Sequence, residues 1–345
     1  LFKGGIPSMY GGRASSILDV KMKEGNAKKL EVNGGVGVIF SRLSIEAPIV
    51  KDKASFIVAA RRSYIDVLAK PFLTGDNANA SFSFYDLTAK VNYTINSKNT
   101  VFMSGYFGRD VFGTGFGFNW GNATLSTRWN HVFSNKLFMN ATAFYSNYDY
   151  MLDSDIENKR PSDAFKWTSN IENLSIKPDF TYYIRPDNTI SFGGQLLTYD
   201  FTPGKANATS NGEKREFGQA NKQGVEASAY VGHDWKINSR LTIQYGVRYS
   251  HYDYKSLNGE YYDRIPVSVS TENPSGYVLK INQTDPNAVV ASYGNWEPRF
   301  ALNLNGNESS SFKLSYNRLV QYIHLMSNTA ASTPLDVWTS STNNI

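Results

Sequence analysis

The chain has 345 residues, a net charge of +5 and 14% aromatic residues, while only 19% of its residues are charged. Its scattered lysines and arginines argue against a nucleic-acid-binding protein, and its lack of cysteine excludes disulfides and thiolate metal sites. The longest clearly apolar run, residues 54–60, is far shorter than the roughly 18 residues of a membrane-spanning helix. No cationic and then apolar leader opens the sequence, so we expect any secretion signal to lie outside it.

The first predicted element follows the paired glycines of YGGRASSILDVKMKEGN, residues 10–26. From Ile17 onward, apolar and polar residues alternate, and the alternation stops at Gly25 and Asn26. A period of two that ends in a Gly-Asn breaker predicts a strand with one covered face.

Beyond Lys29 the sequence predicts a series of strands whose connections alternate in length. About thirteen strands follow, mostly ~10–15 residues long, which is enough to cross a bilayer at a tilt. Short turns at one rim and long loops at the other are typical of outer-membrane barrels, whereas a soluble β-sandwich has shorter strands. The short polar turns fall near residues 51–53, 96–99, 134–136, 186–188, 238–240 and 306–309, and the long loops near 72–82, 112–122, 152–170, 203–222 and 257–293.

The alternation places charged residues opposite apolar ones, as where Phe300 and Leu302 alternate with Arg299 and Asn303. Unpaired charge is costly in a dry core, whereas a water-filled lumen accepts it. The sequence therefore predicts an all-β fold, a transmembrane antiparallel up-and-down β-barrel that is wider than one filled by its own side chains. The residues expected to face inward are Lys90, Lys177, Asp179, Gln195, Glu226, Gln244, Arg248, Glu297, Arg299 and Lys313.

Three predicted strands end in the pattern aromatic-Asp-aromatic. Rings with a polar tip collect where hydrocarbon meets headgroups, so this recurrence favours an aromatic girdle over the alternative that tyrosine simply prefers strands. The predicted girdle consists of Tyr148, Tyr150, Tyr199, Phe201, Tyr252 and Tyr254.

Three stretches resemble TonB-dependent outer-membrane receptors. GGIPSMYGGRASSILDVKMKEGN (residues 4–26) is similar to the end of their plug domain, where a Tyr-Gly segment and a last plug strand lead into the barrel. LEVNGGVGVIFSRLSIEAPIVKDKASFIVAARRSYID (residues 30–66) resembles the first three barrel strands, with a KDK-type periplasmic turn. WEPRFALNLN and SFKLSYNRLVQYIHLMSNTAASTPLDVW, within residues 296–338, resemble a later hairpin, and the order and spacing of all three carry the likeness.

The resemblance implies two parts. Residues 1–27 are expected to be the C-terminal end of a plug domain, and residues 28–345 the N-terminal portion of a barrel of about 22 strands. The junction of plug and barrel is expected at Tyr10, Gly11, Gly12 and Arg13, with Arg13 paired to a lumenal carboxylate. Because thirteen strands leave two unpaired edges in lipid, we expect the chain to be part of a longer receptor.

Chemical signals in the sequence are weak, and no catalytic grouping or cofactor motif is recognised. The four histidines are far apart and lack metal-ligand spacing, and the acidic stretch 153–158 fits no calcium cage. Arg61 and Arg62 either line the lumen for an anionic ligand or, as we favour, pair with a carboxylate. Exposed aromatic residues often mark ligand contact, so ligand-facing loop positions are predicted at Phe116, Phe118 and Trp120, with packing on the plug as an equal alternative.

The leading hypothesis is a TonB-dependent importer, not an enzyme, integral to the outer membrane of a Gram-negative bacterium. Its expected partners are outer-membrane lipids, the TonB energy-coupling complex through a segment absent from this sequence, and an unidentified scarce or large nutrient, with a surface lipoprotein as a further candidate and no nucleic acid. Two rivals remain open: a receptor-like barrel that serves as a structural or binding subunit of an outer-membrane complex, and a passive porin.

Overall fold

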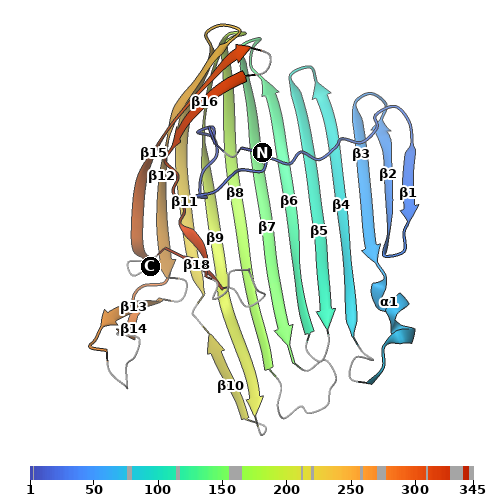
Figure 1. Ribbon diagram of the computed structural model, residues 1–345, viewed down its shortest axis with the longest axis vertical. Helices are drawn as coiled ribbons and strands as arrows, with labels where there is room; N and C mark the ends of the chain where they lie inside the picture. Colours follow the sequence, from blue (N-terminus) through green and yellow to red (C-terminus); the bar gives the residue numbers. More distant parts are fainter. Residues whose placement is uncertain are drawn as a thin grey trace.

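The computed structural model describes residues 1–2, 4–75, 80–113, 117–154, 165–210, 213–218, 221–256, 259–269, 277–307, 310–326 and 337–341. Its main feature is one curved antiparallel sheet in which thirteen strands pair in an unbroken path and one more pairs at the side (Figure 1). The strands of the path are β1 (Glu31–Val36), β2 (Phe40–Val50), β3 (Ala54–Ser63), β4 (Ser81–Asn96), β5 (Asn99–Gly113), β6 (Gly117–Val132), β7 (Leu137–Asp153), β8 (Phe165–Arg185), β9 (Asn188–Ser210), β11 (Lys222–Lys236), β12 (Leu241–Ser256), β15 (Val289–Asn307) and β16 (Ser310–Asn317).

The remaining elements are short and lie outside the main path. They are α1 (Ile65–Ala69), the 3₁₀ turn η1 (Lys70–Phe72), β10 (Glu213–Gly218), which pairs with β9, and the two hairpins β13 (Glu260–Pro266)–β14 (Tyr277–Gln283) and β17 (Ile323–Met326)–β18 (Val337–Ser340). Among the described residues, no helix is long and apolar enough to cross a membrane.

The predicted strand count and short turns are confirmed. Strand ends bracket each of the six predicted turns, and these turns share one rim of the sheet, while α1, β10 and the β13–β14 hairpin lie at the other rim (Figure 1). An up-and-down sheet requires this, because antiparallel neighbours joined by tight turns return to the same edge.

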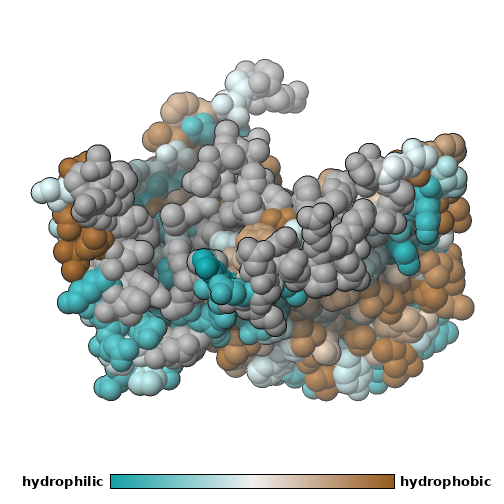
Figure 2. All heavy atoms as spheres, turned by 90° about the horizontal axis from the view of Figure 1, so that it is seen from below, coloured by the Kyte–Doolittle hydropathy of each residue, from teal (hydrophilic) through white to brown (hydrophobic). Residues whose placement is uncertain are grey.

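The two faces of the sheet differ as the alternation predicts. On β15, Trp296 and Leu304 are 61% and 42% exposed, whereas Glu297 and Arg299 are 0% and 5% exposed. On β4, Leu87 and other large apolar residues on the same face are exposed, whereas Lys90 is buried. Apolar side chains gather over part of the outer surface (Figure 2). Such a surface is costly in water and suits contact with hydrocarbon.

The long connections are shorter and more regular than predicted. Residues 117–122 of the expected loop 112–122 belong to β6, and β5 continues to Gly113. Most of the expected loop 203–222 is strand, because β9 extends to Ser210 and folds back as β10. The β13–β14 hairpin occupies part of the expected loop 257–293. The sequence did not predict these strand extensions because it is polar and rich in Gly and Asn there. A strand that continues beyond the membrane needs no apolar face.

The N-terminal segment, residues 1–29, crosses the concave face of the sheet (Figure 1). The prediction of a strand from Ile17 to Glu24 is wrong. An isolated bridge joins Phe2 to Ile17, and residues 18–26 have no regular secondary structure. Leu18 and Val20 are 70% and 74% exposed, so no sheet covers the apolar side of this alternation. Period two alone does not supply a partner strand.

Candidate functional site

The candidate site is the junction at which residues 6–13 lie against the inner wall. Ser8 is 5% exposed and donates a hydrogen bond from Oγ to the Val231 carbonyl at 3.1 Å. Gly232 and Gly246 pair with each other on β11 and β12, and a Cβ at either would come within 2.6 or 2.8 Å of Ser8 Oγ. The two glycines therefore form a niche that receives Ser8.

Paired glycines of the segment meet charged side chains of the wall. A Cβ on Gly11 would lie 2.3 Å from Arg248 Nε, and one on Gly12 would lie 3.3 Å from both carboxylate oxygens of Glu226. Gly12 also has a φ of +76°, which L side chains rarely adopt. The backbone approaches the wall this closely only because side chains are absent at both positions.

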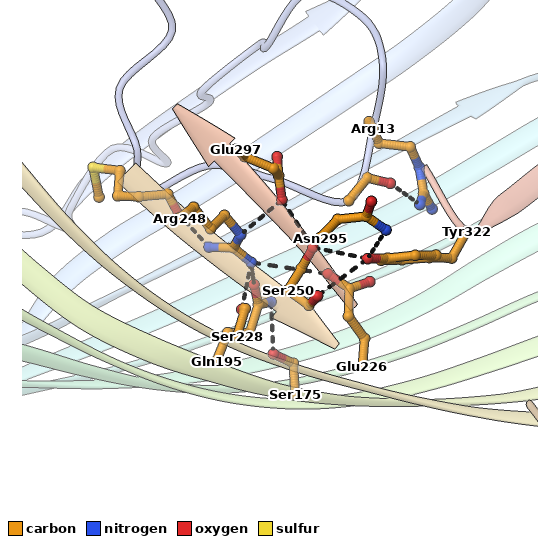
Figure 3. A network of polar contacts seen from close by, with 12 residues as sticks. Arg13, Ser175, Gln195, Glu226, Ser228, Arg248, Ser250, Asn295, Glu297 and Tyr322 are labelled. Carbon is orange, nitrogen blue, oxygen red and sulfur yellow. Dashed lines mark hydrogen bonds and ion pairs between the residues drawn. The ribbon is translucent and has the colours of Figure 1, made fainter. Parts of the chain in front are cut away.

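Four buried charges on neighbouring strands form the centre of the site, and Figure 3 shows three of them, Arg248, Glu226 and Glu297. Arg248 Nη2 lies 3.9 Å from Glu226, and Arg248 Nε lies 3.9 Å from Glu297. Arg299 Nη2 forms a closer pair with Glu297 at 2.9 Å. All four are at most 5% exposed, so each charge depends on its partners rather than on water. The inward placement predicted for these residues is confirmed, and the N-terminal segment and the paired charges shield them from solvent.

The two arginines also hold the backbone of the N-terminal segment. Arg299 Nη1 donates to the Pro7 carbonyl at 2.6 Å, and Arg248 Nη1 donates to the Met9 carbonyl at 3.5 Å. Arg248 Nη2 is further fixed by Ser228 at 2.6 Å and Gln195 at 3.3 Å. The guanidinium groups thus join wall carboxylates to segment carbonyls, which a flat fork of donors can do in several directions at once.

Tyr10 and Arg13 complete the predicted junction. The Tyr10 ring lies under the Lys177 ammonium, 5.4 Å from it, and burial raises the pKa of the Tyr10 phenol. Arg13 donates to the Gly12 carbonyl at 2.7 Å, next to the glycine whose Cβ would meet Glu226. Gly11 and Gly12 thus meet the buried charge cluster directly, while the contacts of Tyr10 are with Lys177 and Asp19.

A second set of contacts fixes the end of the segment to β2, β3 and β4. Lys23 pairs with the buried Glu46 at 2.6 Å, and Lys90 donates to the Met22 carbonyl at 2.9 Å. Gly25 packs so tightly that a Cβ would lie 2.1 Å from the Phe56 carbonyl oxygen. The segment is therefore attached to the wall by two sets of contacts, and most of residues 14–20 between them are exposed.

The prediction of an aromatic girdle is wrong, because its aromatic residues face the concave side of the sheet and not the lipid. Tyr150, Tyr199, Phe201, Tyr252 and Tyr254 are at most 4% exposed, and they face the concave side together with Arg248. Tyr148 lies on the same face and is partly buried. The outward residues of the three motifs are the aspartates between the rings: Asp149 pairs with Arg109 at 2.8 Å, and Asp200 accepts from Gln223 at 2.8 Å.

The predicted ligand-facing loop aromatics are also corrected. Phe118 is 8% exposed and stacks on Trp120 at 4.7 Å, and both belong to β6. Phe116 and most of the acidic stretch 153–158 lie outside the described residues. Arg61 pairs with Asp86 at 2.6 Å, as favoured. Sequence reasoning missed the Ser8 niche and the inward fold of residues 318–326 and 337–341, because both depend on partners more than 80 residues away along the chain.

Parts of this chain are similar to a known protein family and to solved structures. The family model described as an outer membrane beta barrel domain matches residues 191–344. The structure of the siderophore receptor PiuA from Acinetobacter baumannii is similar with a TM-score of 0.61 and 10% identity, covering 93% of this chain and 53% of PiuA. The chain has the fold of the TonB-dependent outer-membrane receptors. It forms part of an integral outer-membrane β-barrel.

Two more receptor-fold structures match over most of the chain. The FrpB iron transporter from Neisseria meningitidis gives a TM-score of 0.60 at 11% identity and covers 93% of this chain and 52% of FrpB. The copper transporter OprC gives 0.59 at 13% identity and covers 89% of this chain and 48% of OprC. The chain thus spans about half the length of these receptors. No curated protein matches the sequence.

Proposed function

We propose that this receptor-fold chain belongs to an importer that uses TonB-relayed energy to bring a scarce or large nutrient across the outer membrane. The observation that carries the proposal is the N-terminal segment, which is held across the concave face by two separate sets of polar contacts. A segment fixed in this way obstructs the lumen, so passage requires work on it. A porin needs no such obstruction.

Residues 1–27 serve in this proposal as the end of the plug, and residues 28–345 as barrel wall. The contacts that hold the segment are hydrogen bonds and ion pairs, which water replaces when the segment is pulled away. Hydrophobic packing would offer no such replacement. Siderophore, iron and copper transport by similar structures supports a nutrient of that kind, with the ligand itself unspecified.

The test measures solute depletion from a complex medium by mass spectrometry. It compares cells that carry the full-length protein with a deletion strain, each with and without a protonophore. We expect at least one solute or trace metal to be depleted only by energised cells that carry the protein.

Depletion that persists without energy would identify a porin and overturn the proposal. Equal depletion by all strains, together with stoichiometric copurification of a surface lipoprotein, would identify a structural subunit and overturn it as well.

A further inference from the structure

The described residues that follow β16 fold back into the concave side. Tyr322 and Ile323 are 3% and 2% exposed and pack in one cluster with the inward aromatic residues of β9 and β12. The Tyr322 ring stacks on Tyr252 at 4.9 Å with an interplanar angle of 8°. β18 lies in front of β9 in Figure 1, and its strand contacts β9 directly. The aromatic-Asp-aromatic motifs of β9 and β12 thus anchor an inward hairpin.

Polar contacts fix the second strand of this hairpin to the wall. Ser340 is fully buried and its Oγ lies 2.6 Å from the Tyr252 hydroxyl. Lys222 Nζ lies 3.2 Å from Thr339 Oγ1. The described parts of the hairpin, residues 318–326 and 337–341, are therefore held from both strands.

A chain of buried hydrogen bonds runs from the hairpin to the N-terminal segment, and Figure 3 shows its first part, from Tyr322 through Ser250 to Glu297. The Tyr322 hydroxyl lies 2.9 Å from Ser250 Oγ, and Ser250 Oγ donates to Glu297 Oε1 at 2.9 Å. Because Ser250 Oγ uses its one proton on Glu297, it accepts from Tyr322, whose hydroxyl proton is shared between Ser250 Oγ and the Ser250 carbonyl at 3.3 Å. The Tyr322 hydroxyl in turn accepts from Asn295 Nδ2 at 3.2 Å. The other oxygen of Glu297 accepts from Arg299, which donates from Nη1 to the Pro7 carbonyl at 2.6 Å.

The relay leaves little room for water. Ser250 and Glu297 are 1% and 0% exposed, and Arg299 is 5% exposed. A partner lost from such a chain leaves a buried polar atom unsatisfied, which is costlier than losing a surface hydrogen bond. A direct contact runs in parallel, since the Ala14 amide donates to Gln321 Oε1 at 3.1 Å.

We propose that Tyr322 is a positioning residue that couples the inward β17–β18 hairpin to the N-terminal segment through Ser250, Glu297 and Arg299. Release of either element from the wall then weakens the attachment of the other. The coupling is a property of the barrel interior and is measured without transport, so its failure is distinct from failure of the proposed import.

The experiment follows thiol labelling in the full-length protein in outer-membrane vesicles. Ser8→Cys, as the sole cysteine, reports release of the segment from its glycine niche, and Ser340→Cys reports release of the hairpin. Tyr322→Phe keeps the stacked ring and removes the hydroxyl. The matched control is Tyr293→Phe, whose ring lies 6.5 Å from Tyr322 and whose hydroxyl is outside the relay.

Tyr322→Phe is expected to raise the labelling rate at position 8 by about two- to tenfold, the range for loss of one hydrogen bond, while Tyr293→Phe leaves it unchanged. Equal rates in the two variants would overturn the proposal. The reciprocal arm uses Gly11→Ala, which displaces the segment and is expected to raise labelling at position 340, because coupling between two sites is mutual. Faster labelling at position 8 with no change at position 340 would show that packing, not coupling, holds the hairpin, and would equally overturn it.

Discussion

At the scale of single residues, glycines decide where the segment meets the wall. Gly11, Gly12, Gly232 and Gly246 all stand at contacts where a Cβ would approach a neighbouring side chain to within 3.3 Å. Their role is to bring backbone carbonyls within reach of buried guanidinium groups. Arg248 is fully buried and held by Ser228 and Gln195 as well as by the segment, so it has little freedom to move aside.

Gly11→Ala is therefore expected to loosen the segment. The new Cβ would meet Arg248 Nε, and overpacking of this kind costs about 1–3 kcal/mol. Hydrogen exchange of the amides of residues 8–13 should accelerate roughly 5- to 150-fold for a loss of that size, at about 1.4 kcal/mol per factor of ten. Gly35→Ala is the matched control, because its Cβ would meet its neighbours at an ordinary 3.6 Å. Unchanged exchange in Gly11→Ala would mean that the segment does not rely on this close approach.

At the scale of elements, β9 and β12 each have an outward apolar part and an outward polar part. On β9, the outward Leu196 is 49% exposed, while four residues further on the outward Asp200 bonds Gln223. On β12, Tyr245 is followed by His251 and Asp253, which bond each other at 3.1 Å. Charged outward residues are costly in hydrocarbon, so the lipid boundary falls between these two parts.

Spin labels on β9 test this boundary. A nitroxide at position 196 should be accessible to oxygen and protected from a water-soluble nickel chelate, whereas one at position 200, about 13 Å further along the strand, should show the reverse. The test uses the full-length protein in lipid bilayers. Protection from the chelate at both positions would place the aspartates in lipid and restore a boundary at the level of the aromatic motifs.

At the scale of the whole molecule, the sheet has two free edges. β1 and β16 stand at the ends of the strand order, and no pairing joins them among the described residues. Unpaired backbone groups cost several kcal/mol each in hydrocarbon, so spanning sheets close into barrels. Similar receptors are about twice as long as this chain, and further strands would complete such a barrel.

The 345-residue chain by itself is accordingly expected not to insert as a closed barrel. Refolded into detergent and then lipid, it should run on unheated gels at the same position as the boiled sample, while the full-length protein should show heat-dependent migration. Heat-dependent migration of the 345-residue chain would show that β1 and β16 can pair directly.

The sequence by itself determined the sheet, its turns and the side on which most strand residues lie. Alternation fixes which residues share a face, and long unbroken strands carry that information from end to end. The alternation also predicts which way the aromatic motifs face. Tyr252 and Arg248 are four positions apart on one strand, so their side chains point to the same face of the sheet. The prediction of an aromatic girdle failed because it relied on the preference of aromatic residues for the membrane interface and not on the alternation along each strand.

Only the tertiary structure decided what meets inside the barrel. Gly11 and Arg248 are 237 residues apart, and Tyr252 and Ser340 are 88 apart. Periodicity predicts a polar inner face, but it does not state whether water, a segment or a hairpin covers that face. Shape and charge complementarity between distant parts of the chain settle this, and they exist only once the sheet has curved.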